Sequence, residues 1–291
     1  MKRTLLDGER TMIAIRSSAV LVSVLTLTSA ACKRDATFTE PIPPNAAIHW
    51  VEAIPDTMQE DMRVIDIVSN AGLYAANFRG ANMFYQGIQA GSRRIRIFNH
   101  STDPVVAQQI LVDTTISFAA TDSVTFIHMG FARTGSTPPR AVHLFTDKAS
   151  DPGAGNVGVR VIHVGAGLGN LDAFLIRRPQ DTTALASPIA TNVAYGAFSV
   201  YTPVAGDTGS QALQIVVTAT GTTAPVLARV SFPVGVAADT VNRVNPIAGA
   251  RIPGSVMTAV IVPPSVVGSM AASFTTPGAI ILVDRRPPDR Y

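Results

Sequence analysis

The sequence predicts an all-β protein built from two tandem antiparallel β-sandwich domains, and three observations support this. Short apolar or alternating runs, bounded by Gly, Pro, Asn and Asp, recur along the chain as half-buried strands do. No window beyond the first 31 residues keeps a helical period. The order of the runs in the first half returns in the second half, which indicates an internal repeat. A chain of 291 residues is long enough for two cores.

The first domain is expected over residues 61–149. Its strands are predicted from four runs that are separated by turn-forming residues. These runs are MRVIDIV (62–68), RRIRIFN (93–99), SVTFIHM (123–129) and AVHLFTD (141–147).

The second domain is expected over residues 157–286, after a boundary at DKASDPGAGN (147–156). Its runs match segments of the first domain in the same order. The expected pairs are VRVIHVG (159–165) with MRVIDIV, LDAFLI (171–176) with LYAANF (73–78), ALQIVVTA (212–219) with RRIRIFN, VMTAVIV (256–262) with SVTFIHM, and AIILVDR (279–285) with AVHLFTD. In this alignment Asp66 stands at the position of His163.

The first 31 residues are predicted to be a signal peptide, with Met12 as an alternative start. Arg16 precedes an uncharged run over 17–31, and small residues lead to Cys32, the only cysteine. This is the layout of a secretory signal. The run is shorter than the roughly 20 residues that a membrane-spanning helix needs.

The end of this segment resembles a bacterial lipoprotein signal. Ala30, Ala31 and Cys32 match that pattern, whereas Ser29 departs from it and also allows ordinary cleavage after Ala31. The resemblance implies that Cys32 is diacylated on sulfur and that the protein is attached to a membrane through its N-terminal lipid. Two or more acyl chains give stable anchoring where one does not. Lys33 after the cysteine implies the outer membrane or cell surface; a secreted or periplasmic protein is the alternative.

Residues 32–60 are predicted to be a tether, because Pro41, Pro43 and Pro44 favour an extended chain. The stretch 48–56 carries the only Trp, so it is expected either to continue the tether or to pack on the first domain.

The second half resembles the family called domain of unknown function 4397. The segments that carry the resemblance are VRVIHVGAGLGNLDAFLI and VAYGAFSVYTPVAGDTGSQALQIVVTATG. The matching residues are His163, Asp172, Tyr195, Gly196, Ala205 and Gly206. The resemblance covers 157–235 well and 60–148 more loosely. It implies immunoglobulin-like sandwiches in a secreted or envelope protein, and it assigns no activity.

Charge excludes one class of partner. The first 31 residues hold four Lys or Arg and two Asp or Glu, so their removal lowers the formal net charge from +3 to +1. A nucleic-acid-binding chain is expected to carry a clustered basic face, so no nucleic acid partner is predicted.

No catalytic or metal site is predicted from local motifs. The five histidines lack the spacing of a zinc site, although His128 and His143 lie in neighbouring predicted strands. The G-x-S-x-G elbow of serine hydrolases is absent, and HVGAGLGN (163–170) is read as a loop between two strands rather than a nucleotide loop. No cofactor is implied.

Three residues are candidates for ligand binding: His163, Asp172 and Tyr195. Around Tyr195, the aromatic residues Phe198 and Tyr201 are expected either to form a carbohydrate or peptide platform or to pack in the core.

The function expected from the sequence is that of an exported, lipid-anchored cell-envelope protein. It would act as a non-catalytic binding or structural module of unknown ligand, with a protein or glycan partner at loops or edge strands. The alternative is an envelope hydrolase whose site is formed by loops of the second domain, 177–188 and 236–255.

Overall fold

The computed structural model describes residues 43–69, 71–177, 187–208 and 213–289. The first half holds β1 (Asn45–Glu52), β2 (Glu60–Val64), β3 (Gly72–Ala76), β4 (Gln86–Gln89), β5 (Gly91–Asn99), α2 (Pro104–Ala107), β6 (Ile110–Phe118), β7 (Ser123–Met129) and β8 (Ala141–Thr146). The second half holds β9 (Asn156–His163), β10 (Leu171–Ile176), β11 (Ala190–Val193), β12 (Thr202–Ala205), β13 (Gln214–Ala219), β14 (Val226–Ser231), β15 (Val256–Val262) and β16 (Gly278–Arg285).

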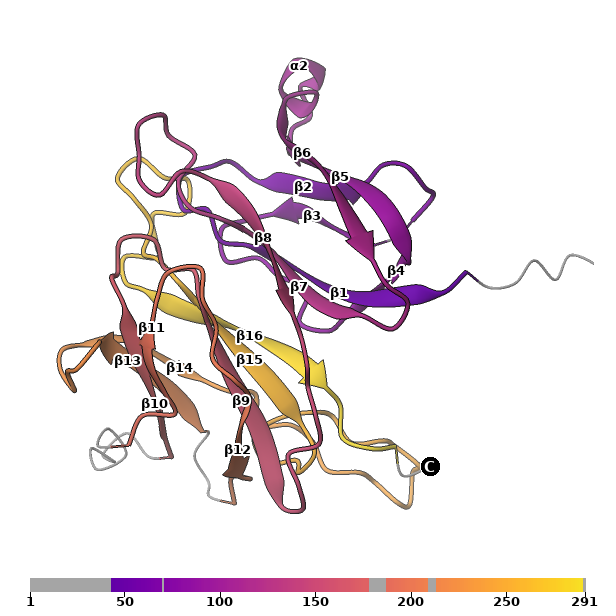
Figure 1. Cartoon of the computed structure of the whole chain (residues 1–291), viewed down its shortest axis with the longest axis vertical. Helices are drawn as coiled ribbons and strands as arrows, with labels where there is room; N and C mark the ends of the chain where they lie inside the picture. Colours follow the sequence, from indigo (N-terminus) through magenta and orange to yellow (C-terminus); the bar gives the residue numbers. More distant parts are fainter. Residues whose placement is uncertain (1–42, 70, 178–186, 209–212, 290–291) are drawn as a thin grey trace, which may run out of the picture. The chain divides into compact units, whose positions relative to one another are not determined.

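The strands form four four-stranded sheets, consistent with two β-sandwich domains (Figure 1). The sheets of the first half have the orders β4-β1-β7-β8 and β3-β2-β5-β6. Those of the second half have the orders β12-β9-β15-β16 and β11-β10-β13-β14. Adding eight to each strand number of the first half therefore gives the strand order of the second half. The prediction of an all-β class with a recurring strand order is confirmed. No helix among the described residues is long and apolar enough to cross a membrane.

The immunoglobulin-like strand order that the resemblance implied is not confirmed. In an immunoglobulin constant-type sandwich, strands A, B, E and D share one sheet, and C, F and G share the other. Here the first, fourth, seventh and eighth strands share a sheet, and β1 pairs with β7 in parallel from Ala47↔Ser123 to Glu52↔His128. β9 and β15 repeat this parallel pairing. Alternation predicts that a run is a strand, but it does not encode which distant strand is its neighbour.

The first core begins earlier than the predicted boundary at residue 61. Ala46, Ile48 and Trp50 of β1 are buried in the core cluster between the two sheets of the first half. The Trp50 ring lies 4.9 Å from that of Phe126 on β7. Burial of such large apolar side chains contributes roughly 1.5–3 kcal/mol each. Residues 45–60 therefore belong to the folded first half, and the prediction that they form part of a tether is wrong.

The two halves also share a hydrophobic cluster. Its members come from β1, β7 and β8 and from β9, β15 and β16, and include Val51, Ile127, Phe145, Ile162 and Val260. Of these strands, β1, β7, β9 and β15 are buried on both faces, which explains why VMTAVIV of β15 reads as a continuous apolar run rather than an alternating one.

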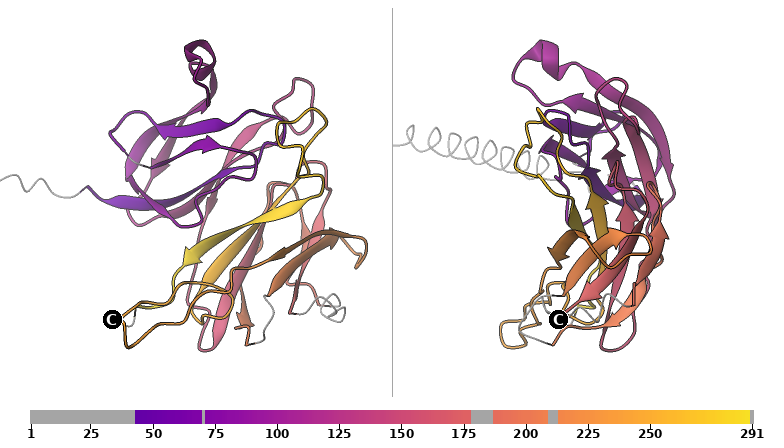
Figure 2. Two further views of the ribbon diagram at one scale, coloured as in Figure 1. Left: turned by 180° about the vertical axis from the view of Figure 1, so that it is seen from behind. Right: turned by 90° about the vertical axis from the view of Figure 1, so that its left-hand side faces the viewer.

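A loop of the second half extends the contact between the halves. Residues 263–277 connect β15 and β16 and lie beside loops of the first half in both views of Figure 2. Ser269 donates a hydrogen bond to the Pro55 carbonyl at 2.6 Å, and Arg133 donates to the Val267 carbonyl at 2.7 Å.

Two of the five predicted repeat pairs are displaced by one strand. β9, which holds VRVIHVG, takes the place of β1 rather than that of MRVIDIV in β2. Equivalent backbone hydrogen bonds follow β1 and β9. The Ala53 N–H donates to the His128 carbonyl after β1, and the Val164 N–H donates to the Ile261 carbonyl after β9. Glu52, not Asp66, therefore occupies the position of His163. The error arose because β1 lies in the stretch that was read as tether. The pairs β5/β13, β7/β15 and β8/β16 agree with the prediction.

Candidate functional site

Two buried clusters of ionisable side chains lie in the described part of the chain. The first joins Glu52, Glu60 and His128, which we call the Glu–Glu–His cluster. Glu52 ends β1, Glu60 begins β2, and His128 lies beside Glu52 in the parallel pair of β1 with β7. The loop of residues 53–59 carries the chain from the sheet that contains β1 to the sheet that contains β2. The carboxylates of Glu52 and Glu60 therefore lie close together. All three side chains have 0% exposure.

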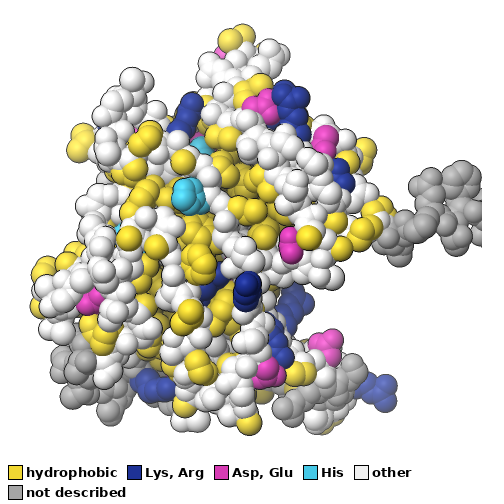
Figure 3. Space-filling model, viewed as in Figure 1, with side chains coloured by type: hydrophobic (Ala, Val, Ile, Leu, Met, Phe, Trp, Pro, Cys, Tyr) yellow, Lys and Arg dark blue, Asp and Glu magenta, His cyan; other side chains and the backbone are white. Residues whose placement is uncertain are grey.

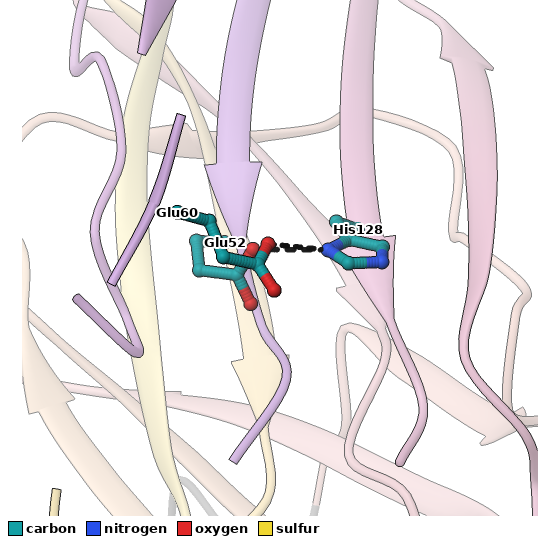
Figure 4. Close-up of side chains that lie close together, drawn as sticks. All are labelled: Glu52, Glu60 and His128. Atoms are coloured by element: carbon teal, nitrogen blue, oxygen red, sulfur yellow. Dashed lines mark hydrogen bonds and ion pairs between the residues drawn. The ribbon is translucent and has the colours of Figure 1, made fainter. Parts of the chain in front are cut away.

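The imidazole Nδ1 of His128 faces both carboxylates (Figure 4). It lies 2.7 Å from Oε2 of Glu60 and 3.2 Å from Oε2 of Glu52. The backbone N–H of Ile54 donates to Oε1 of Glu52 at 2.6 Å, which fixes that carboxyl group against its own loop. Within the described residues, Oε1 of Glu60 and Nε2 of His128 are buried and make no hydrogen bond of normal geometry.

Burial and charge divide the protons of this cluster unequally. Burial, followed by the negative charge of Glu60, raises the pKa of Glu52 well above its usual range. Burial also acts to raise the pKa of Glu60, but hydrogen bonds from His128 and Glu52 outweigh it and the pKa falls. Burial acts to lower the pKa of His128, and the two glutamates outweigh it and raise that pKa to about 9. Near pH 7 the cluster therefore pairs an ionised Glu60 with a protonated His128, and burial beside Glu60 disfavours a second negative charge on Glu52.

The second cluster links the two halves through Arg160 of β9, and we call it the inter-half network. Arg160 is 1% exposed. Its guanidinium donates to Oδ1 of Asp147 at 2.5 Å, to the Thr146 carbonyl at 3.2 Å and to Oγ1 of Thr258 at 3.0 Å. The same group lies 4.5 Å from the centre of the Tyr201 ring.

The network is reciprocal between the halves. Arg160 of the second half meets Asp147 of the first half, and His49 of the first half lies 3.5 Å from Asp284 of the second half. His49 and Arg160 occupy equivalent places, since they lie opposite Thr125 and Thr258 in the two parallel pairs.

Each aspartate of the network also accepts a hydrogen bond within its own half. Thr125 donates to Asp147 at 2.8 Å, and Thr258 donates to Asp284 at 2.6 Å. Asp147 also accepts from the hydroxyl of Tyr85 at 2.8 Å. Burial raises the pKa of Asp147 although Arg160 opposes that shift, and burial with two nearby aspartates raises the pKa of Tyr85. Within the network, the buried Arg160 guanidinium and the Asp147 carboxylate therefore compensate each other.

The predicted candidate His163 ends β9, and the loop that follows it encloses its ring. Its Nε2 donates to the Gly169 carbonyl at 2.7 Å, and its Nδ1 accepts from the Gly165 N–H at 3.1 Å. Burial lowers the pKa of His163, so the imidazole is neutral. The ring of Tyr195 meets it edge-on, with centroids 6.1 Å apart, and burial raises the pKa of Tyr195 to about 12. The loop 163–170 joins β9 to β10, as predicted for a connection between strands.

The predicted candidate Asp172 lies on β10 and binds backbone groups. Its carboxylate accepts from the N–H groups of Asn192 and Gly221, each at 2.8 Å. Asn192 has a positive φ of 51°, which non-glycine residues rarely adopt. Asp61 plays the same part in the first half, where it accepts from Ala75 at φ 49°. The structure thus brings together His163 and Tyr195, while Asp172 organises a neighbouring turn.

Sequence reasoning missed Glu52 and Glu60 because both lie in the stretch read as tether. His128 was named only as a neighbour of His143, and the structure separates them: His143 is exposed on β8, while His128 is buried against the glutamates. The one available signal was a glutamate at each end of a Pro- and Asp-containing turn, the first of them between the apolar residues Val51 and Ala53. Cys32, the signal segment, and residues 178–186 of the predicted hydrolase loop lie outside the described residues.

The fold defines the chain as an all-β protein whose two halves share one strand order. Residues 46–174 match the model of the family described as Domain of unknown function (DUF4397), and the chain contains one such domain there. This match spans all strands of the first half, β9 and most of β10, so the expectation that 157–235 would be the clearer part is wrong. No curated protein matches the chain.

Proposed function

We propose that this chain is an exported, lipid-anchored protein of the cell envelope that acts as a non-catalytic binding or structural module. The anchor is Cys32, and the membrane is the outer membrane or cell surface. The second half is a second member of the same family, diverged in its loops. The recurring strand order supports that part of the proposal.

The observation that carries the structural role is the inter-half network. It joins Asp147, the residue after β8, to Arg160 of β9 by a buried ion pair at 2.5 Å, and it joins β1 to β16 through His49 and Asp284 at 3.5 Å. Side chains at both contacts are 0–1% exposed. Ionisable residues enclosed in this way hold the two halves as one body and are closed to a substrate. A rigid pair of sandwiches presents its loops and edge strands at fixed positions to a partner.

The surface supports a protein or glycan partner. On the face seen in Figure 3, hydrophobic side chains gather across the middle, and charged side chains of both signs are scattered among them. A pocket of about 530 Å³ is lined by Phe198, Val200 and Tyr201, together with Lys148 and Ser150. Phe198 is 50% exposed and Val200 is 78% exposed. Exposed aromatic and apolar side chains of this kind mark interaction sites.

The alternative of an envelope hydrolase has less support. In the 236–255 loop, backbone bridges join Val236 to Ile247 and Asp239 to Val244, and Asp239 accepts hydrogen bonds from Val241 and Asn242. That carboxylate therefore stabilises its own turn rather than pointing toward a nucleophile or a base.

The test of the anchor is the intact mass of the mature protein from its native membrane fraction, beside a Cys32→Ser variant. The proposal expects a chain that begins at Cys32 and carries acyl chains, with both the lipid and the membrane association lost in the variant. An unmodified chain in the soluble fraction would contradict the anchor. Turnover of an envelope glycan by the purified protein would contradict the non-catalytic role.

A further inference from the structure

We propose that Glu52, Glu60 and His128 form a binding site for a divalent transition-metal ion, of which zinc is the type. The donors are one imidazole nitrogen and the carboxylate oxygens of two glutamates. One ligand atom from each residue lies within 4.8 Å of the other two, and all three side chains are fully buried (Figure 4).

The first argument is that the fold does not need these three ionisable residues. The second half has the same strands, and there the equivalent positions hold His163, Leu171 and Ile261. Leu171 and Ile261 pack in the core of that half. Replacing buried ion pairs by apolar residues is often neutral or stabilising, so a Glu–Glu–His cluster kept in one half alone indicates a role other than packing.

The second argument is an unused donor atom. Oε1 of Glu60 is buried and makes no hydrogen bond of normal geometry within the described residues. A carboxylate oxygen left in this state costs free energy unless a cation or donor reaches it. It belongs to the same carboxylate that meets Nδ1 of His128 at 2.7 Å. With one oxygen from each glutamate and Nδ1 of His128, the three residues supply three protein donor atoms, and Oε1 of Glu60 is available as a further one.

The geometry is close to that of a coordinated ion. Bond lengths of about 2.0–2.2 Å from zinc to nitrogen and oxygen place tetrahedral ligand atoms about 3.3 Å apart. Nδ1 of His128 is 3.2 Å from Oε2 of Glu52 and 2.7 Å from Oε2 of Glu60, so the second of these two separations must open, and the ligand atoms of all three residues already lie within 4.8 Å of one another. Two carboxylates neutralise a divalent ion, and the imidazole donor favours zinc over calcium or magnesium.

An approach to the site lies beside the 53–59 loop. A pocket of about 500 Å³ is lined by residues of this loop, by Asn77 and Phe78, and by four residues of the 263–277 loop, Met270, Ala271, Ser273 and Phe274. Thr57 is part of the pocket wall, and its hydroxyl is near enough to lower the pKa of Glu60.

The test uses the purified protein after treatment with a chelator. Zn²⁺ and Mn²⁺ are titrated separately by calorimetry, and bound metal is counted after gel filtration. The matched variant is Glu60→Leu with His128→Ile, which places the apolar residues of the second half at two of the three positions and is expected to fold. The control is His143→Gln, which removes an exposed imidazole from the neighbouring strand.

The proposal expects one zinc ion per wild-type chain, an unchanged stoichiometry in His143→Gln, and an affinity loss of at least about 100-fold in the double variant. Zinc should also raise the melting temperature of the wild type but not that of the double variant. Equal zinc binding by the wild type and a folded double variant would overturn the site. So would the absence of any bound metal in the wild type.

Discussion

Arg160 and Asp147 lie on opposite sides of the connection between the two halves, and the guanidinium donates to the carboxylate at 2.5 Å in a fully buried position. The equivalent residue of the first half, His49, faces Asp284 of the second half at 3.5 Å. The two contacts are reciprocal, as across a two-fold interface, although both lie in one chain. The halves are therefore held together by polar contacts that neither half could complete alone.

Removal of one partner of the buried pair should destabilise the protein strongly. Arg160→Met leaves Asp147 buried without its cation, and breaking such a pair costs about 3–5 kcal/mol. Urea unfolding followed by tryptophan fluorescence measures the change, since Trp50 is the only tryptophan. Arg94→Met is the control, because Arg94 pairs with Asp113 on the exposed surface and should change stability little. Equal effects of the two variants would contradict the role of the network.

Replacement of both partners should cost less than replacement of one. In Arg160→Met with Asp147→Leu no charge is left unpaired, so part of the stability lost in Arg160→Met should return. The free energies of unfolding of the wild type, both single variants and the double variant form a double-mutant cycle. If the two single effects simply add, Arg160 and Asp147 are not coupled and the account of the network fails.

The stability contributed by His163 should depend on pH. Burial lowers its folded pKa below the unfolded value of about 6.5. Above pH 6.5 both states are neutral and the stability is fully present. As the pH falls below about 6.5 the unfolded chain takes up a proton first, so stability is lost by at most about 1.4 kcal/mol per pH unit until the folded pKa is reached.

The measurement is urea unfolding of the wild type and of His163→Gln at several pH values between 4.5 and 8, chosen to span about two units on either side of the unfolded pKa. The stability difference between the two proteins should be greatest near pH 8 and should shrink as the solution is acidified. A difference that stays constant over this range would show that His163 does not titrate in the way its buried position requires.

Asp172 should be important for stability even though it lies apart from both clusters. Asp172→Leu leaves the N–H groups of Asn192 and Gly221 without their acceptor, at about 1–3 kcal/mol each. Asp239→Ala also removes a carboxylate that accepts backbone N–H groups, but in an exposed turn, and should have a much smaller effect. Melting temperatures of the two variants give the comparison. A larger loss in the Asp239 variant would contradict this ranking.

The sequence predicts the class of fold well because strand alternation and turn residues are local signals. β5, β7 and β8 and their counterparts in the second half were all found in this way. β1 was missed because Pro43 and Pro44 stand just before it and its last residue is the charged Glu52. The loss of this one strand displaced two repeat pairs and hid two residues of the Glu–Glu–His cluster.

The two polar clusters could not be predicted from local pattern. Arg160 lies within an apolar strand, and nothing near it in the sequence indicates burial or names Asp147 as its partner. Glu60 and His128 are brought together only by the pairing of β1 with β7 and the return of the chain into β2. Contacts between distant strands are decided by sheet topology, which alternation does not encode.

The central claim is that the two sandwiches behave as one rigid module because of the inter-half network. Differential scanning calorimetry of the wild type and of Asp147→Asn tests it most directly. The account predicts one cooperative transition in the wild type, with equal calorimetric and van't Hoff enthalpies, and a lower melting temperature in the variant. Two separate transitions in the wild type, both unmoved by Asp147→Asn, would contradict it.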